Sequence, residues 1–178
     1  MIKKVLIANR GEISRRIARS CRKLDIEYVT VFSDADRGSE HLEGAQETVY
    51  IGRNPAEQSY MSIEAIIKAA IESRCDAVHP GYGFLSENAM LASRVEESGL
   101  IFIGPKPETI ELLGNKAKAR QLIQKIGIPV LPGGDEASDS PDSIHDMIKR
   151  IGFPVILKPV AGGGGAGDEC HQLQRESL

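Results

Sequence analysis

A glycine cluster near the carboxyl terminus has the residue types that could bind a phosphate group. The apolar run Val155–Leu157, typical of a buried strand, is followed by Lys158 and by a segment with five glycines in six positions. The glycines are Gly162, Gly163, Gly164, Gly165 and Gly167. Such a backbone can direct several N–H groups at phosphate oxygens, and a lysine at the end of a buried strand is costly without an anion. A flexible glycine-rich linker is the other interpretation.

The spacing of this cluster excludes the P-loop of nucleoside triphosphatases. Gly162 and Gly167 have the separation of G-x-x-x-x-G, but Asp168 stands where that motif has lysine. Glu169 stands where it has serine or threonine. A phosphate site in this segment must therefore be of another kind.

Lys116 is a second candidate for a phosphate contact. It opens a predicted helix over 116–126, directly after Gly114 and Asn115, and a cation in the first turn opposes the helix dipole. An anionic ligand would remove the conflict. An exposed lysine that destabilises the helix by roughly a few tenths of a kcal/mol explains the pattern equally well.

A ten-residue loop, HPGYGFLSEN from His79 to Asn88, combines glycines with polar side chains. Gly81 and Gly83 would let the backbone approach a ligand closely. The polar side chains are those of His79, Tyr82 and Glu87. In the alternative interpretation the glycines shape a turn, the apolar residues fill the core, and Ser86 caps a helix that begins there.

These candidate residues follow apolar runs that alternate with segments of helical periodicity. The sequence predicts strands at 5–8, 28–32, 48–51, 77–78 and 100–103, and helices near 13–24, 63–71, 86–97, 107–113 and 116–126. This alternation is typical of an α/β protein with a doubly wound parallel sheet. We expect a domain boundary near Gly114 and a loop at 132–143. Ligands of such sheets bind beyond the carboxyl ends of the strands, where the candidate residues lie.

The segment Asn9–Glu12 follows the first predicted strand. It lacks the second and third glycines of the dinucleotide-binding motif G-x-G-x-x-G. A tight turn with Glu12 in the first turn of a helix and a role in ligand binding are equally compatible with this segment.

Composition and charge narrow the class of protein further. The chain has 178 residues, 41% hydrophobic and 26% charged, enough for one domain, or one domain and part of another. The net charge is −3 with both signs mixed along the chain, so we expect neither nucleic acid nor a membrane surface as a partner. No apolar run approaches the about 20 residues that a membrane span needs.

The cysteines and the amino terminus indicate the cellular compartment of the protein. Cys21, Cys75 and Cys170 are isolated and show neither a disulfide framework nor the spacing of a zinc site. The amino terminus lacks the small-residue cleavage site of an export signal. We therefore expect a reducing, cytoplasmic environment.

Taken in order, five segments resemble the amino-terminal part of biotin carboxylase, a member of the ATP-grasp superfamily. They are IANRGEI at 7–13, the loop 79–88, FIGP at 102–105, GNK at 114–116, and PVILK at 154–158 with its glycine cluster. The resemblance covers about residues 1–167, and the loop 79–88 is highly specific. It implies a Rossmann-like domain at 1–114 and an incomplete ATP-grasp portion at 115–178 with a divergent tail at 168–178.

The resemblance implies a role for each group of candidate residues. Lys116 and Lys158 match lysines that contact ATP phosphates, and 162–167 match the loop that closes over the nucleotide. Tyr82 falls where the family contacts the biotin region. No residue of this chain matches a catalytic residue or a metal ligand.

The resemblance also implies a reaction and its partners. The family uses ATP, Mg²⁺ and bicarbonate to carboxylate biotin, which is borne by a carrier protein. The parent would be a carboxylase of the acetyl-CoA, propionyl-CoA, methylcrotonyl-CoA or pyruvate type. Arg16 and Arg19 match positions near the family's dimer contact, so a homodimer through the first helix is expected.

The sequence departs from the family at three places. Asn115 replaces a commoner aspartate, and Ala166 replaces a basic residue in the glycine cluster, which lowers the expected affinity for anions. After Gly167 the sequence resembles a truncation or a shifted reading frame. We therefore expect an inactive fragment that binds ATP weakly or not at all. A non-catalytic module that pairs with a full-length subunit and one half of a split enzyme are the alternatives.

Overall fold

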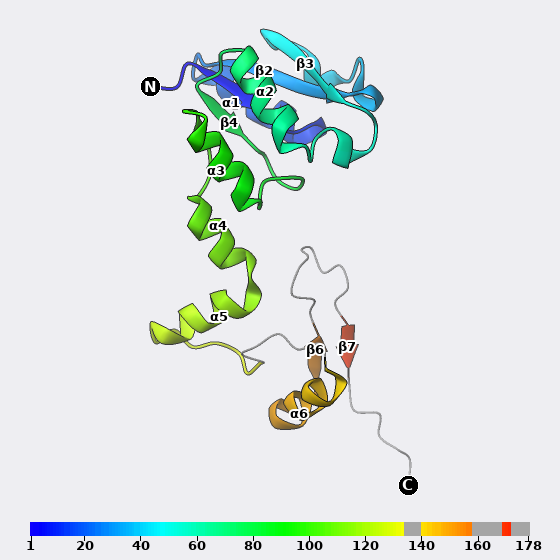
Figure 1. The fold of residues 1–178 in the computed structure, drawn as a ribbon, viewed down its shortest axis with the longest axis vertical. Helices are drawn as coiled ribbons and strands as arrows, with labels where there is room; N and C mark the ends of the chain where they lie inside the picture. Colours follow the sequence, from blue (N-terminus) through cyan, green and yellow to red (C-terminus); the bar gives the residue numbers. More distant parts are fainter. Residues whose placement is uncertain (134–139, 158–168, 172–178) are drawn as a thin grey trace. The chain divides into compact units, whose positions relative to one another are not determined.

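A computed structural model describes residues 1–133, 140–157 and 169–171 (Figure 1). The chain forms two compact units, residues 1–111 and 112–178, and the division falls within helix α4 (Pro107–Gly114). Each unit is described by itself. Among the described residues, no helix is both long and apolar enough to cross a membrane.

The first unit contains a five-stranded parallel sheet with the strand order β3-β2-β1-β4-β5. The strands are β1 (Lys4–Ile7), β2 (Glu27–Ser33), β3 (Glu47–Gly52), β4 (Ala77–His79) and β5 (Ile101–Phe102). Helices α1 (Gly11–Lys23), α2 (Ile63–Glu72) and α3 (Ala89–Glu97) connect them, with 3₁₀ turns η1 (Asp34–Asp36), η2 (Glu40–Leu42) and η3 (Ala56–Gln58). The predicted α/β class and doubly wound parallel sheet are confirmed.

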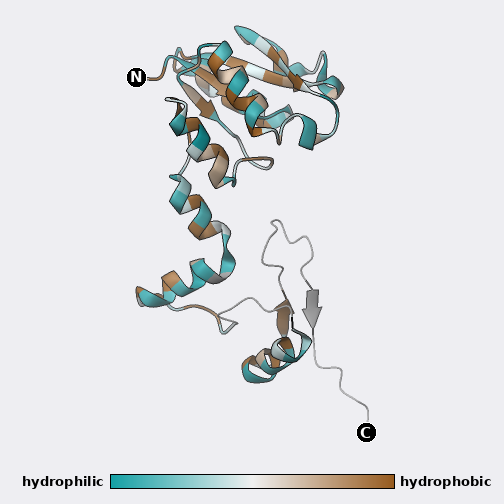
Figure 2. Cartoon of the chain, viewed as in Figure 1, coloured by the Kyte–Doolittle hydropathy of each residue, from teal (hydrophilic) through white to brown (hydrophobic). Residues whose placement is uncertain are grey.

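Both faces of the sheet are buried, which explains the continuous apolar runs in its strands. Figure 2 shows the apolar residues of the sheet and of its helices in brown. On one face, α2 and α3 cover the strand residues Leu6, Val29, Val31 and Val78. On the other face, Ile13, Ile17, Ala18 and Cys21 of α1 cover Val5, Ile7, Tyr28 and Ala77.

The third helix begins later than the sequence predicts. Asn88, and not Ser86, is its N-cap: the Asn88 side chain accepts a hydrogen bond from Leu91 N at 2.9 Å. Gly81, Gly83 and Phe84 all have positive φ, a conformation that cannot continue as a right-handed helix. The loop therefore stays irregular up to the cap.

The second unit contains the carboxyl-terminal elements. They are the end of α4, α5 (Lys116–Lys125), α6 (Pro141–Ile151), and an antiparallel pair of strands, β6 (Val155–Leu157) and β7 (Glu169–His171). Helix α6, with proline in its first turn, starts inside the region expected to be a loop. Strand β7 lies within the segment expected to be a divergent tail, and its backbone pairs with β6.

Leu6 tests the contribution of the central strand to stability. Its side chain is fully buried in the α2 and α3 face, so Leu6→Ala should lower the free energy of unfolding by roughly 2–5 kcal/mol. The matched control Leu24→Ala, at a residue that is 68% exposed, should change it by less than about 0.5 kcal/mol. Urea denaturation measures both, and equal effects would contradict the assignment of Leu6 to the core.

Candidate functional site

The candidate site lies where β1 and β4, adjacent strands of the sheet, end. The backbone pairing of β1 with β4 extends one residue beyond the end of β1, because Ala8 N donates a hydrogen bond to His79 O at 2.9 Å. The segment Asn9–Glu12 and the loop 79–84 therefore leave the sheet side by side. The carboxyl edge of a parallel sheet is the usual ligand-binding position, as the sequence predicted.

The Asn9 side chain joins these two segments. Its Nδ2 donates hydrogen bonds to Pro80 O and to Tyr82 O, each at 2.8 Å, and its Oδ1 accepts one from Arg10 N at 2.9 Å. Asn9 is 3% exposed, so both amide protons and the oxygen are satisfied away from water.

Gly81 lies between the two bound carbonyl groups. Its φ is +70°, and a Cβ atom there would approach Asn9 Nδ2 to 2.8 Å. Gly81 N donates to Nδ1 of His79 at 3.0 Å. Burial, together with the positive charge of Arg16, lowers the pKa of His79, so the imidazole is neutral and can accept this bond at neutral pH.

Tyr82 extends from the loop into solvent. Its side chain is 61% exposed, and its hydroxyl donates to Glu12 Oε2 at 2.9 Å. The hydrogen bond to Glu12 and the negative charge of that carboxylate raise the pKa of Tyr82. A neutral, exposed phenol is therefore presented at the carboxyl edge of the sheet, where a ligand could contact it.

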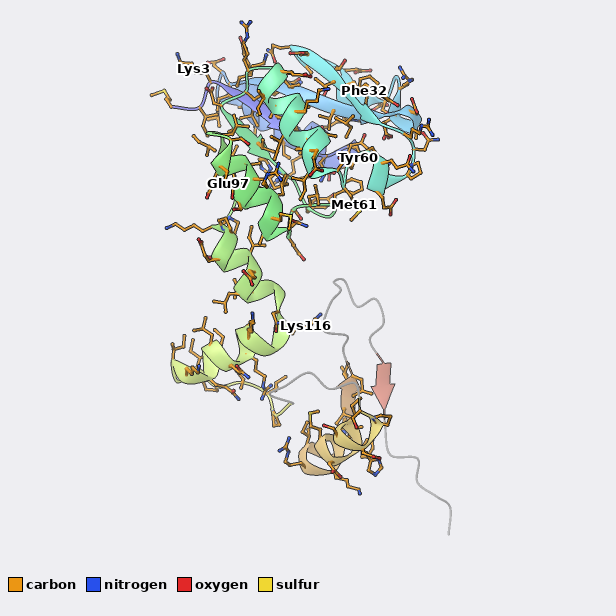
Figure 3. All side chains as sticks on the ribbon, in the orientation of Figure 1. Lys3, Phe32, Tyr60, Met61, Glu97 and Lys116 are labelled. Carbon is orange, nitrogen blue, oxygen red and sulfur yellow. The ribbon has the colours of Figure 1, made fainter. Side chains whose placement is uncertain are left out.

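Arg10 connects the same loop to the partly buried carboxylate of Asp36. Its guanidinium lies over the rings of Tyr60 and Phe84, 5.4 and 5.5 Å from their centroids, and its Nη1 is 3.3 Å from Asp36 Oδ2. The two rings are stacked with centroids 5.0 Å apart. Tyr60, labelled in Figure 3, and Ser33 each donate a hydroxyl hydrogen bond of 2.8 Å to Asp36 Oδ2.

These contacts determine the protonation states of Asp36 and Tyr60 at neutral pH. Burial by itself would raise the pKa of Asp36, but hydrogen bonds from Tyr60 and Ser33 and the charge of Arg10 hold it below its usual range. Burial and the bond to Asp36 raise the pKa of Tyr60. The network therefore holds a charged carboxylate, a charged guanidinium and a neutral phenol at neutral pH.

The contact of Arg10 with Asp36 and Tyr60 was not predicted from the sequence. The position of Arg10 just after the first predicted strand was a signal that it lay at the sheet edge. No periodicity indicates that Asp36 and Tyr60 meet it, since Asp36 ends η1 and Tyr60 follows η3.

A charged groove of about 980 Å³ lies beside α1. Four arginines line it, Arg10, Arg15, Arg19 and Arg22, and four carboxylates of Glu12, Asp36, Glu40 and Glu43 oppose them. Arg15 forms an ion pair with Glu40. The groove is thus balanced in charge and has no excess of cations for an anionic ligand. Arg16 and Arg19, the predicted dimer contacts, are both exposed on α1.

The predicted phosphate contacts belong to the other end of the chain. Lys116, labelled in Figure 3, is exposed as the first residue of α5, where the Asn115 side chain accepts a hydrogen bond from Lys118 N. Lys158 and 162–167 lie outside the described residues. Over 1–133, 140–157 and 169–171, no three His, Cys, Asp or Glu side chains are grouped to hold a metal ion.

Asp36→Asn tests the network of Arg10, Asp36 and Tyr60. Loss of the charge beside Arg10 should lower the free energy of unfolding at pH 7 by roughly 1–3 kcal/mol. The pKa of Asp36 is lower in the folded than in the unfolded protein, so its contribution is complete above about pH 4 and disappears as the pH falls through the folded pKa. The difference in the free energy of unfolding between wild type and variant should therefore become smaller in acid.

Urea denaturation across that pH range measures the difference. Asp34→Asn is the matched control, because Asp34 bonds to Arg37 and Tyr50 at the surface. It should change the free energy of unfolding by less than about 0.5 kcal/mol. A difference for Asp36→Asn that stays constant with pH would contradict the charge assigned to Asp36.

Family comparisons cover both parts of the chain. Residues 1–110 match the family described as "Biotin carboxylase, N-terminal domain", and residues 115–177 match "Carbamoyl-phosphate synthase L chain, ATP binding domain". The biotin carboxylase of Allochromatium vinosum is 52% identical over 168 residues, which are 94% of this chain and 37% of that protein.

Two solved structures share the fold. One is the biotin carboxylase domain dimer of Hydrogenobacter thermophilus 2-oxoglutarate carboxylase, in complex with MgADP, ADP and bicarbonate. The other is a Campylobacter jejuni biotin carboxylase complex with β,γ-ATP. Each is 41% identical with a TM-score of 0.92 and covers 97% of this chain. The chain spans 38% and 39% of their lengths.

Proposed function

The chain belongs to the biotin carboxylase family, and we propose that it supplies the amino-terminal domain and the start of the ATP-binding domain of an enzyme that carboxylates biotin. ATP and bicarbonate would be the other substrates, and a biotin carrier protein the partner. The observation that carries this proposal is the loop 79–88, with Tyr82 exposed at the carboxyl edge of the sheet, within a chain that matches biotin carboxylases along almost its whole length.

We propose a division into a Rossmann-like domain at 1–114 and an ATP-grasp portion at 115–178, with the tail at 168–178. The two compact units and the two family matches support it. The buried thiols of Cys21 and Cys75 are consistent with the proposed cytoplasmic location.

In this proposal the second domain contacts the nucleotide. Lys116 fits a contact to a phosphate group, because its cation is exposed at the first turn of α5. Lys158 and 162–167 would complete the contact to the phosphates. Among the described residues no group of three His, Cys, Asp or Glu side chains could hold Mg²⁺, and we propose no metal ligand there.

The first domain would receive biotin. Tyr82 offers a neutral hydroxyl and an aromatic face, suited to contact a largely apolar bicyclic group with polar edges. In this proposal Tyr82 binds and orients biotin. Phosphoryl transfer depends on metal ions and positioned charges, so we propose that the 178-residue polypeptide does not hydrolyse ATP by itself.

A chimera tests the proposed function. Residues 1–157 would replace the corresponding part of Allochromatium vinosum biotin carboxylase, and the chimera should hydrolyse ATP in a manner that requires bicarbonate and free biotin. Lys116→Ala should raise its KM for ATP about tenfold, since a charged contact to phosphate is lost. Lys125→Ala, at the other end of the same helix, is the matched control and should leave KM nearly unchanged. A folded chimera without activity would refute the proposal.

Nucleotide binding by the isolated chain provides a second test of the proposed function. Its affinity for ATP should be no tighter than about 1 mM, or roughly 4 kcal/mol, because charge and backbone dipoles alone would hold the phosphates. Binding should weaken with salt and be similar for ATP, GTP and tripolyphosphate. Isothermal titration measures it, and micromolar binding that prefers ATP would show a complete nucleotide pocket.

Contact with another subunit is a second candidate function. It is favoured by the exposure of Arg16 and Arg19 on α1, the helix that the family resemblance connects with dimerisation. A module that pairs with a full-length carboxylase subunit would use this face. Size-exclusion chromatography of the chain, alone and mixed with such a subunit, distinguishes the two functions.

A further inference from the structure

The loop that carries Tyr82 has a backbone shape that its own sequence holds only weakly. Gly81, Gly83 and Phe84 have φ values of +70°, +68° and +41°, and no strand partner pairs with them among the described residues. Three local hydrogen bonds support the loop: from Gly81 N to His79 Nδ1, from Ser86 N to Gly83 O, and from Asn88 N to Leu85 O. None of them binds the carbonyl groups that flank Gly81.

The Asn9 amide binds both of those carbonyl groups. One nitrogen donates to Pro80 O and to Tyr82 O, two residues apart along the loop and more than seventy residues away in sequence. The oxygen of the same amide accepts a hydrogen bond from Arg10 N. A side chain with the oxygen and the nitrogen exchanged would therefore lose all three bonds. An aspartate would have the same shape, but its carboxylate would face two carbonyl oxygens and repel them.

The direction of these bonds determines where Tyr82 lies. The backbone carbonyl of Tyr82 is bound to the buried amide, while its ring extends into solvent and its hydroxyl meets Glu12. Arg10, between these two anchors in the sequence, lies over Phe84. Three of the four residues of the segment Asn9–Glu12 therefore contact the same loop.

We propose that Asn9 is a positioning residue, whose amide holds the backbone of residues 80–82 so that Tyr82 is presented to biotin at the carboxyl edge of the sheet. The statement that Tyr82 meets biotin rests on the proposed function. The statement that Asn9 holds the backbone of residues 80–82 does not. The segment Asn9–Glu12 is thus a support for the biotin-contacting loop, which resolves whether it is a turn or a ligand-binding segment.

The test uses the 178-residue chain with Asn9→Asp, which keeps the size of the side chain and the acceptor for Arg10 N. Amide hydrogen exchange at Gly81 and Ser86 should accelerate about tenfold, while exchange within β2 should change less than about twofold. The matched control is Ser14→Ala, which removes a buried hydroxyl of α1 that has no hydrogen-bond partner among the described residues, and it should leave the loop unchanged.

Tyr82 provides a signature that a general loss of stability would not produce. NMR of ring-labelled tyrosine should show the pKa of Tyr82 falling toward its ordinary value in Asn9→Asp, because the ring leaves Glu12. Tyr50 of β3, whose hydroxyl donates a hydrogen bond to Asp34 of η1, is the internal reference and should keep its raised pKa. Acid should partly reverse the accelerated exchange relative to wild type, because protonation of the introduced carboxylate restores one donor.

Gly81→Ala is an independent variant, should Asn9→Asp fail to fold. Its Cβ would displace the Asn9 amide, and the same changes confined to the loop are expected. Loop exchange and a Tyr82 pKa equal to those of Ser14→Ala would overturn the proposal, as would acceleration spread equally over β2. Because no biotin enters these measurements, their result is separate from that of the chimera, which tests the proposed function.

Discussion

The parallel pairing of β1 with β4 is the constraint on which the rest of the first unit depends. The pairing aligns Ile7 with His79 and extends one residue further, to Ala8. It brings together two segments that are about seventy residues apart in sequence, and both then turn away from the sheet at the same edge. Apolar side chains on both faces hold this register, because a slip of one residue would place every strand side chain on the opposite face.

Polar groups at this edge are stable only because each has a partner. Asn9 uses both amide protons and its oxygen, and Asp36 accepts from two hydroxyls beside a guanidinium. A buried polar group without a partner costs roughly 1–3 kcal/mol, so the loss of one member would affect the others. The phenol of Tyr82, in contrast, is exposed and stays available to a ligand.

The two units divide the proposed chemistry between them. The first carries the loop assigned to biotin, and its groove beside α1 balances arginines with carboxylates, so it does not favour a polyphosphate. The second carries Lys116 and the elements that match an ATP-binding domain. The proposed carboxylation of biotin would draw on both units. The chain spans 37% of the Allochromatium vinosum relative and 38% of the Hydrogenobacter thermophilus domain.

Much of the architecture could be predicted from residue patterns alone. Buried strands leave continuous apolar runs and helices leave a 3.6-residue period, so the α/β class and the parallel sheet followed from local chemistry. The glycines of the loop 79–88 indicated an irregular backbone, and Tyr82 was recognised as a candidate there. The start of α3 was missed, because Ser86 and Asn88 are both good caps and only the backbone conformation of the loop chooses between them.

The sequence by itself therefore determined the fold class and offered candidate residues such as Tyr82. The tertiary structure decided which residues act together: Asn9 with Pro80 and Tyr82, and Arg10 with Asp36, Tyr60 and Phe84. The physical reason is that hydrogen bonds and ring contacts act over a few ångströms between segments far apart in sequence. Their pairing depends on strand register and loop conformation, which local periodicity does not encode.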